Sequence, residues 1–333
     1  MRPRVIYQHP LAYLLGLEGI ALLRAFAGEY DRGFTLARIE EIRALLDAAD
    51  ELGDGVEETP MTMQEGYALW APWYDEPGNE LLEVEEPVVR EIIDALPVGV
   101  ALDAACGTGR HGAYLASLGH RVIGVDATPE MLDVARAKIP AGEFYEADLR
   151  ELPVADDSVD LVVCAIAASH LPELAPAFAE FARVLRPGGH LVLSDSRGLI
   201  GDIGLPLARV RPDGTFGYIP VWSRLASDYL AVALAAGFEV RRCEELRRRT
   251  PLVDHEGRDL SDSDTPEHRP GRPPNIWALH RFAPEATNAA YRGLPVVIVW
   301  HFQLSAADAS GRSRRRRRGR GGARSSGGGS AHR

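Results

Sequence analysis

The sequence predicts an α/β fold: a doubly wound, mainly parallel sheet with helices on both faces. From about residue 100 onward, short apolar runs alternate with amphipathic segments of helical period, a pattern typical of parallel strands joined by helices. A glycine-rich turn follows the first of these runs. The chain has 333 residues, 46% of them hydrophobic, which is enough to bury one large core or two modest ones and excludes disorder as its overall state.

The N-terminal part predicts helices. We expect two of them in residues 10–55, the second over residues 36–52, which together form an N-terminal helical cap over residues 1–56. The first apolar run also resembles a signal peptide. Glu18 and Arg24 interrupt it, and the spacing of its leucines fits an amphipathic helix, so we favour a packed helix.

The sheet and its covering helices are expected next, within one domain over residues 57–305. A helix is expected over residues 79–96, with Asn79 as its N-cap. Strands are expected at residues 100–104, 121–125, 143–146, 161–165, 190–194, 237–244 and 295–304. Helices are expected near residues 110–118, 129–138, 173–185, 227–236 and 275–291. Arg186-Pro187-Gly188-Gly189 is expected as the turn before the fifth strand.

Two segments have compositions that do not fit a packed core. Residues 249–274 are rich in Asp, Ser, Pro, Gly and Arg and predict a mobile surface loop. Residues 306–333 predict a disordered tail rich in Arg, Gly and Ser. Residues 312–333 hold nine arginines and no acid; since these contribute +9 to a net charge of −11, the other 311 residues carry −20. An acidic body of this kind disfavours nucleic acid as a partner.

The cysteines indicate a reducing compartment. Cys106, Cys164 and Cys243 are widely spaced, with no CxxC or Cys/His pattern, which argues against a disulfide framework and against structural zinc. The apolar runs fall short of the ~20 residues that a membrane span needs. We therefore predict a cytoplasmic protein with no metal site and no membrane association.

The chemistry-bearing motif follows the first predicted strand. Gly107-x-Gly109-x-x-Gly112 matches the dinucleotide fingerprint, and Asp126, at the end of the next strand, could bind a ribose hydroxyl. An NAD(P)-dependent oxidoreductase is therefore one hypothesis. Asp103 counts against it, because a carboxylate four residues before the first glycine would lie beside a pyrophosphate, where like charges at ~4 Å repel by several kcal/mol.

A cationic cofactor without phosphate fits this motif better, and here the sequence resembles a known family. Residues 67 to 304 resemble the class I S-adenosylmethionine-dependent methyltransferases, specifically the small-molecule group called type 11. The resemblance rests on the glycine motif, on the residues around Asp126 and Asp148, on residues 160–171 and on residues 183–191. It implies a Rossmann-like sheet of seven strands. One position departs from the family pattern: Ala105 stands where the first glycine is usual.

The resemblance also implies a cofactor site for S-adenosyl-L-methionine. Asp103, Gly107 and Gly109 would lie around the methionyl end, Asp126 would accept hydrogen bonds from both ribose hydroxyls, and Asp148 with Leu149 would bind the adenine. The backbone near Ala165 would lie by the methionine. Ala105 and Ala127 complete the implied cofactor-binding set. The three carboxylates follow three successive strands, whose ends share one crevice in a parallel sheet.

Four aromatic residues and a histidine are candidates for contact with the substrate. Tyr67, Trp70, Trp73 and Tyr74 precede the first core helix; we expect Trp70 to pack the cap and either Tyr67 or Tyr74 to contact substrate. His170 follows the fourth strand and suits a general base, although a capping role is the alternative. His111 is expected to be structural, and Cys106 to be a small packed residue.

The sequence therefore predicts a methyltransferase that moves a methyl group to an O, N or C nucleophile of a small molecule by in-line displacement, with His170 and Tyr74 as candidate catalytic residues. Three alternatives remain. They are an NAD(P)-dependent oxidoreductase, a non-catalytic RNA-binding or interaction module that uses the basic tail, and a methyltransferase that acts on RNA or protein, of which the acidic body disfavours RNA.

Overall fold

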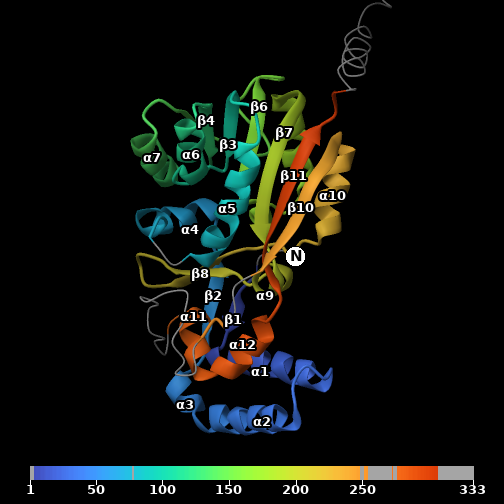
Figure 1. Ribbon diagram of the computed structural model, residues 1–333. Coiled ribbons are helices and arrows are strands. Elements are labelled where there is room, and N and C mark those ends of the chain that lie inside the picture. The colour runs from blue at the N-terminus through green and yellow to red at the C-terminus, as the bar shows by residue number, and fades with distance from the viewer. Residues whose placement is uncertain (1–3, 77–78, 248–250, 254–271, 273–275, 307–333) are drawn as a thin grey trace, which may run out of the picture.

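The computed structural model describes residues 4–76, 79–247, 251–253, 272 and 276–306. Its main element is a seven-stranded sheet in the order β10-β11-β7-β6-β3-β4-β5 (Figure 1). The strands are β3 (Val100–Ala104), β4 (Arg121–Asp126), β5 (Glu143–Glu146), β6 (Val159–Ala165), β7 (Leu185–Ser196), β10 (Phe238–Arg247) and β11 (Pro295–Leu304). The prediction of a Rossmann-like, mainly parallel sheet of seven strands is confirmed.

One strand runs against the others. β11 pairs antiparallel with both β7 and β10, whereas β3 pairs parallel with β4 and β6, and β5 with β4. The order of the central strands reverses between β6 and β3, since β3 continues to β4 on one side and β6 to β7 on the other. In open α/β sheets, ligands bind beyond the carboxyl ends of the strands at such a reversal.

Helices cover both faces of this sheet. One face packs on α5 (Glu80–Asp94) and α6 (Arg110–Ser117), and Val89, Ile93 and Leu115 are in its core. The other face packs on α8 (Ala175–Val184) and α10 (Ala226–Ala235), through Phe178 and Tyr229 among others. The helix α7 (Pro129–Lys138) contacts β4, β5 and α6. Because both faces of the central strands are buried, their sequences are continuous apolar runs.

A second sheet of four strands lies below the first, in the order β1-β2-β9-β8. It joins β1 (Ile6–Gln8) and β2 (Val56–Pro60) to β8 (Leu207–Val210) and β9 (Phe216–Ile219), which the sequence did not predict. The strands have three to five residues, and β2 pairs with β9 across more than 150 residues of chain, so local patterning carries little signal.

The lower sheet positions a helix beside the main one. β2 leads into α4 (Met63–Trp70), which is followed by the 3₁₀ helix η1 (Ala71–Trp73). α4 lies close against β9: a Cβ on Gly66 would lie only 2.3 Å from Cγ1 of Ile219, so a side chain there would clash. The Met61 backbone N–H donates to the Tyr218 carbonyl at 2.9 Å. Residues 61–74 are thus fixed by segments far away in the sequence.

The N-terminal helices pack with the C-terminal part of the chain. α1 (Pro10–Phe26), α2 (Arg32–Asp47) and α3 (Ala49–Leu52) form one cluster with α11 (Ile276–Leu279) and α12 (Pro284–Tyr291). The division into a cap over residues 1–56, a domain over 57–305 and a tail over 306–333 stays a prediction, and residues 307–333 lie outside the described part.

Several local expectations need correction. The turn expected at residues 186–189 lies within β7, at a register shift where Leu185 pairs with Val159 and His190 with Leu161. The helix expected near residues 275–291 is broken into α11, the 3₁₀ helix η3 (His280–Phe282) and α12. Most of the predicted loop over residues 249–274 lies outside the described residues. Its Leu252 and Val253 are buried in the N-terminal cluster rather than at the surface.

Small elements complete the described structure: α9 (Gly198–Ile203) after β7, and the 3₁₀ helix η2 (Ala168–His170) after β6. Of the described helices, none combines the length and the apolar character that a membrane crossing requires.

Candidate active site

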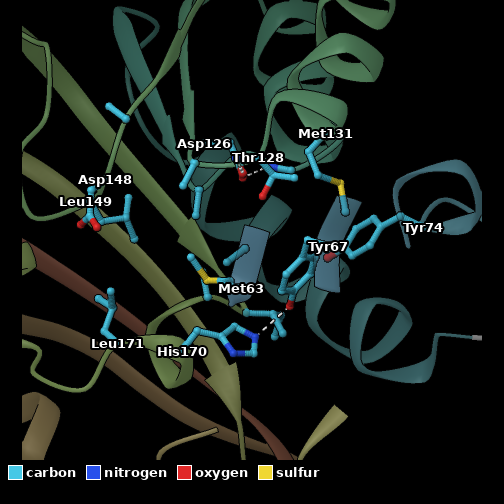
Figure 2. Close-up of a pocket in the computed structure, with 17 residues that line it drawn as sticks. Met63, Tyr67, Tyr74, Asp126, Thr128, Met131, Asp148, Leu149, His170 and Leu171 are labelled. Carbon is cyan, nitrogen blue, oxygen red and sulfur yellow. Dashed lines mark hydrogen bonds between the residues drawn. The ribbon is translucent and has the colours of Figure 1, made fainter. Parts of the chain in front are cut away.

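A pocket lies at the carboxyl ends of β3, β4, β5 and β6, where the order of the strands reverses (Figure 2). It holds about 660 Å³ of empty space, including its open mouth. The lining residues are Met63, Tyr67, Tyr74, Ala105, Gly107, Asp126, Ala127, Thr128, Met131, Ala147, Asp148, Leu149, Ala165, Ile166, Ala167, His170 and Leu171. All of the predicted site residues except Asp103 and Gly109 are among them.

The turn after β3 brings its backbone into the pocket. The Cys106 N–H donates to the Val125 carbonyl at 2.9 Å, and the Gly109 N–H donates to the Cys106 carbonyl at 2.8 Å. Gly107 has a φ of +52° and faces open space, because a Cβ built on it would meet no atom within 4 Å. A ligand can therefore approach the main chain closely here.

Ala105 carries backbone strain in this turn, since its φ is +58°. The left-handed conformation costs a residue with a Cβ about 1–2 kcal/mol. Glycine relieves this cost but gains entropy in the unfolded chain, about 0.5–1 kcal/mol. We therefore expect Ala105→Gly to raise the free energy of unfolding by up to about 1 kcal/mol in chemical denaturation. A variant less stable than the parent would show that the methyl group contributes packing that outweighs the strain.

Asp126, at the end of β4, closes the turn from the other side. Its Oδ2 accepts from the Gly107 N–H at 2.8 Å, and its Oδ1 accepts from the Thr128 N–H at 2.9 Å. Burial raises the pKa of Asp126, and these backbone donors oppose the shift. A carboxylate oxygen can accept a second hydrogen bond, so Asp126 can still accept from a ligand in the pocket.

Asp148 and Leu149 follow β5 and lie on the other side of the pocket from Tyr67 and Tyr74 (Figure 2). Asp148 pairs with Arg150 at 2.6 Å, and hydrogen bonds from Arg150 lower the pKa of its carboxyl. Leu149 is buried. This side thus presents a carboxylate beside an apolar surface.

Asp103 and Gly109 lie outside the lining. Asp103 is buried beneath the turn, where its Oδ2 accepts from the Gly112 N–H at 2.7 Å; burial raises the pKa of Asp103 to about 6. Gly109, at a φ of +79°, packs against Ala135 on α7, and a Cβ there would lie 3.1 Å from the Ala135 Cβ. In this structure both residues support the turn from behind.

The predicted aromatic residues have different surroundings. Tyr67 and Tyr74 line the pocket, with ring centroids 6.3 Å apart. Trp70 stacks on Tyr67 at 5.8 Å, and the Arg209 guanidinium lies over the Trp70 ring, 4.2 Å from its centroid. Trp73 is 61% exposed. Tyr67 and Tyr74 are thus the members of this cluster that a ligand in the pocket can reach.

His170 lines the pocket, whereas His111 and Cys106 do not. The His170 Nε2 lies 2.8 Å from the Tyr67 hydroxyl oxygen, and burial lowers the pKa of His170. His111 is buried, with its Nε2 3.0 Å from Glu85 Oε1. Burial raises the pKa of Cys106 well above its usual value, which fits a packed thiol rather than a nucleophile.

Sequence analysis did not single out the other lining residues. Thr128, Met131 and Ala147 lie close to predicted residues in the sequence. Their positions near the predicted ends of strands and helices could have identified them as lining residues. Ile166 follows β6 with a φ of +51°, which is unusual for a β-branched residue and has no sequence signature. Met63 reaches the pocket only because the lower sheet holds α4 in place. The remaining residues of this kind are Ala167 and Leu171.

The charges in the lining are of one sign. It contains two carboxylates, Asp126 and Asp148, and no Lys or Arg among the residues that the structure describes there. Anionic phosphates are normally bound by basic side chains or helix N-termini. The pocket suits a ligand with hydroxyl or amino donors and a positive charge.

Comparison with known proteins assigns this region to a family. Residues 102–193, which supply β3 to β7 and most of the lining, match the family described as "Methyltransferase domain". Residues 102–193 are therefore similar to methyltransferase domains. Over 106 residues the chain is 38% identical to malonyl-[acyl-carrier protein] O-methyltransferase of Yersinia pestis, which covers 32% of this chain and 40% of that protein.

The chain is also similar to other proteins over part of its length. Demethylmenaquinone methyltransferase of Chlorobaculum parvum is 43% identical over 89 residues, which covers 26% of this chain and 37% of that protein. The crystal structure of an S-adenosylmethionine-dependent methyltransferase from Mesorhizobium loti aligns with a TM-score of 0.45 at 21% identity, over 66% of this chain and 97% of that one. The chain thus spans less than half the length of the two curated relatives.

Proposed function

We propose that this chain is an S-adenosyl-L-methionine-dependent methyltransferase that acts on a small-molecule nucleophile. The observation that carries the proposal is the lining of the pocket: two carboxylates and, among its described residues, no Lys or Arg, in a region similar to methyltransferase domains. A cationic cofactor is stabilised by such a lining, whereas the diphosphate of a dinucleotide is repelled.

The residues present fit this cofactor. Asp126 would accept hydrogen bonds from the ribose hydroxyls, because each of its oxygens keeps a free lone pair. Asp148 and Leu149 would hold the adenine, the carboxylate at its amino group and Leu149 at its face. The open backbone at Gly107, with Ala105 and Ala165, would lie along the methionyl end. When bound, the cofactor supplies an electrophilic methyl group on a sulfonium.

The remaining lining residues would hold the methyl acceptor. Met63, Tyr67, Tyr74, His170 and Leu171 form a mainly apolar wall away from Asp126 and Asp148. Their task is to align the nucleophile with the methyl group at ~3 Å and to exclude water. The two relatives are named for different acceptors, malonyl-acyl carrier protein and demethylmenaquinone, so their names support the class of reaction but do not specify its acceptor here.

Ligand titration distinguishes this proposal from the oxidoreductase hypothesis. We expect S-adenosylhomocysteine to bind the purified full chain in isothermal titration calorimetry, and NADH and NADPH to give no heat of binding under the same conditions. The physical reason is the missing counter-charge for a diphosphate in the pocket. Binding of a nicotinamide dinucleotide, or of none of the three compounds, would contradict the proposal.

Two further predictions concern RNA binding and the location of the protein in the cell. The RNA-binding alternative rests on residues 306–333, most of which lie outside the described residues, and nothing in the pocket favours it. A cytoplasmic location is proposed from the cysteines, since Cys106, Cys164 and Cys243 are free thiols in the structure.

A further inference from the structure

The hydrogen bonds of His170 define which of its nitrogens carries a proton. Its Nδ1 lies 3.2 Å from the carbonyl oxygen of Pro220, and a carbonyl oxygen can only accept. Nδ1 is therefore the protonated nitrogen. Burial lowers the pKa of His170, so the ring is neutral at neutral pH. In a neutral imidazole the other nitrogen, Nε2, has a free lone pair and acts as an acceptor.

That lone pair is directed at Tyr67. The Tyr67 hydroxyl lies 2.8 Å from Nε2, and the two rings meet edge to face at 83° with centroids 5.4 Å apart (Figure 2). Tyr67 must therefore donate to His170. Its oxygen keeps its lone pairs for a donor on the pocket side, where both residues line the cavity.

Three separate segments hold this pair in position. Tyr67 is on α4, His170 ends η2, and Pro220 follows β9. The Trp222 N–H donates to the Ser169 carbonyl at 2.8 Å, which ties the segment after β9 to η2. If His170 had only a packing role, its two ring nitrogens would not need separate hydrogen bonds, one from Nδ1 to the Pro220 carbonyl and one from the Tyr67 hydroxyl to Nε2.

We propose that Tyr67 and His170 form a proton relay that makes the pocket specific for acceptors whose nucleophile is a hydroxyl group. This inference rests on the proposed methyltransferase function and narrows its substrate class. An amine that is already neutral attacks without a base, whereas a phenol or alcohol must lose its proton as it attacks.

The step balances in atoms and charge. The acceptor oxygen forms a bond to the methyl carbon, and the electron pair of the broken carbon–sulfur bond stays on the sulfur. The acceptor proton moves to the Tyr67 oxygen, and the Tyr67 proton moves to Nε2 of His170. The products are a methyl ether, a neutral thioether, neutral Tyr67 and a His170 imidazolium, so the single positive charge passes from sulfur to imidazole.

The surroundings of the pair favour a relay over an ionised tyrosine. Burial raises the pKa of Tyr67 well above its usual value, so a tyrosinate is costly, and in the relay Tyr67 stays neutral. The charge of Asp195, buried on β7, raises the pKa of His170 against the effect of burial and so favours the imidazolium. The titratable or charged groups that act on Tyr67 are Tyr74, Arg209, Asp126 and Asp195.

Nitrogen NMR tests the resting state without any acceptor. In the ¹⁵N-histidine-labelled full chain at pH 7.5, we expect one ring to show a protonated Nδ1 and an unprotonated, hydrogen-bonded Nε2, and to vanish in His170→Gln. Tyr67→Phe should shift its Nε2 resonance, whereas Tyr74→Phe, which removes a hydroxyl from the same pocket, should shift it far less. A proton on Nε2, or an unchanged resonance in Tyr67→Phe, would overturn the relay.

Methyl transfer tests the function of the pair. The full chain is incubated with tritiated S-adenosylmethionine and a cell extract, and mass spectrometry identifies the labelled products. We expect O-methylated products, with the rate at pH 7 reduced about 100-fold in Tyr67→Phe and in His170→Gln. The loss should shrink as pH rises and the acceptor ionises in solution, with the affinity for S-adenosylhomocysteine retained.

The outcomes separate the two proposals. Transfer to nitrogen or carbon, or a rate in Tyr67→Phe within threefold of the parent at every pH, would overturn the relay and leave the methyltransferase proposal intact. Lack of S-adenosylhomocysteine binding by the parent chain would overturn the methyltransferase proposal itself, and the relay with it.

Discussion

Replacing Asp126 by alanine is expected to weaken the binding of S-adenosylhomocysteine at least ~10-fold. In the proposed binding mode the variant would lose two hydrogen bonds to the ribose hydroxyls, and charge-assisted bonds of this kind contribute about 1.5–3 kcal/mol each. A loss of about 3 kcal/mol corresponds to about 100-fold in affinity. It also removes the acceptor for the Gly107 and Thr128 N–H groups, which lie 2.8 and 2.9 Å from the carboxylate, so the glycine turn loses support. Calorimetric titration of the folded variant measures the effect.

A nearby carboxylate provides the matched control. Asp133 is on α7 with its side chain 77% exposed, and it pairs with Arg136 at 3.2 Å, away from the pocket lining. Asp133→Ala removes the same charge from the same side of the sheet and should leave the affinity unchanged within about twofold. If Asp126→Ala bound the ligand as tightly as the parent, the ribose assignment would be wrong.

The second large effect concerns stability and comes from Glu58 on β2. This side chain is 0% exposed, and neither of its carboxylate oxygens has a hydrogen-bond partner. Burial raises the pKa of Glu58 to about 7. The folded state therefore binds this proton more tightly than the unfolded state does, and stability is greatest at pH values below the unfolded pKa and falls as pH rises through about 7.

Glu58→Gln is expected to remove this loss. Because a tenfold difference in proton affinity between the folded and unfolded states corresponds to about 1.4 kcal/mol, the free energy of unfolding at pH 8 should rise by up to about 3 kcal/mol, with little change near pH 4.5. Urea denaturation between pH 4.5 and 8.5 provides the measurement. Glu57→Gln, on the exposed face of the same strand, should change stability by less than about 0.5 kcal/mol. An identical pH slope in Glu58→Gln and in the parent would show that Glu58 is not the group responsible.

The sequence predicted the central strands of the main sheet well because both of their faces are buried. β3 and β11 begin and end at the predicted residues, since an apolar run bounded by turn residues is visible locally. The strands of the lower sheet were not predicted. Their pairing, such as Thr59 with Gly217, is a long-range event that short segments do not encode.

The lining residues that follow the strands of the main sheet could be predicted from the sequence, whereas the other lining residues could not. Residues at the ends of β4, β5 and β6 were placed correctly at the pocket because parallel strands share one edge. Asp103 was not, because side chains alternate along a strand. Leu102 and Ala104 belong to the core on the α8 face, so Asp103 points to the α6 side and beneath the turn. Met63 and Tyr67 reach the pocket because the lower sheet positions α4, which carries both residues.

The close contact of Gly66 with Ile219 implies that two parts of the pocket lining can be altered separately. The strand pair 207–219 packs against the helix that carries Tyr67, whereas Asp126 ends β4 and Asp148 follows β5 in the main sheet. Exchanging that hairpin for one of different length should change the position of Tyr67 and, under the proposed function, the choice of methyl acceptor. The part of the pocket lined by Asp126 and Asp148 should keep its shape. Residues 207–219 can therefore be varied without changing the strands of the main sheet.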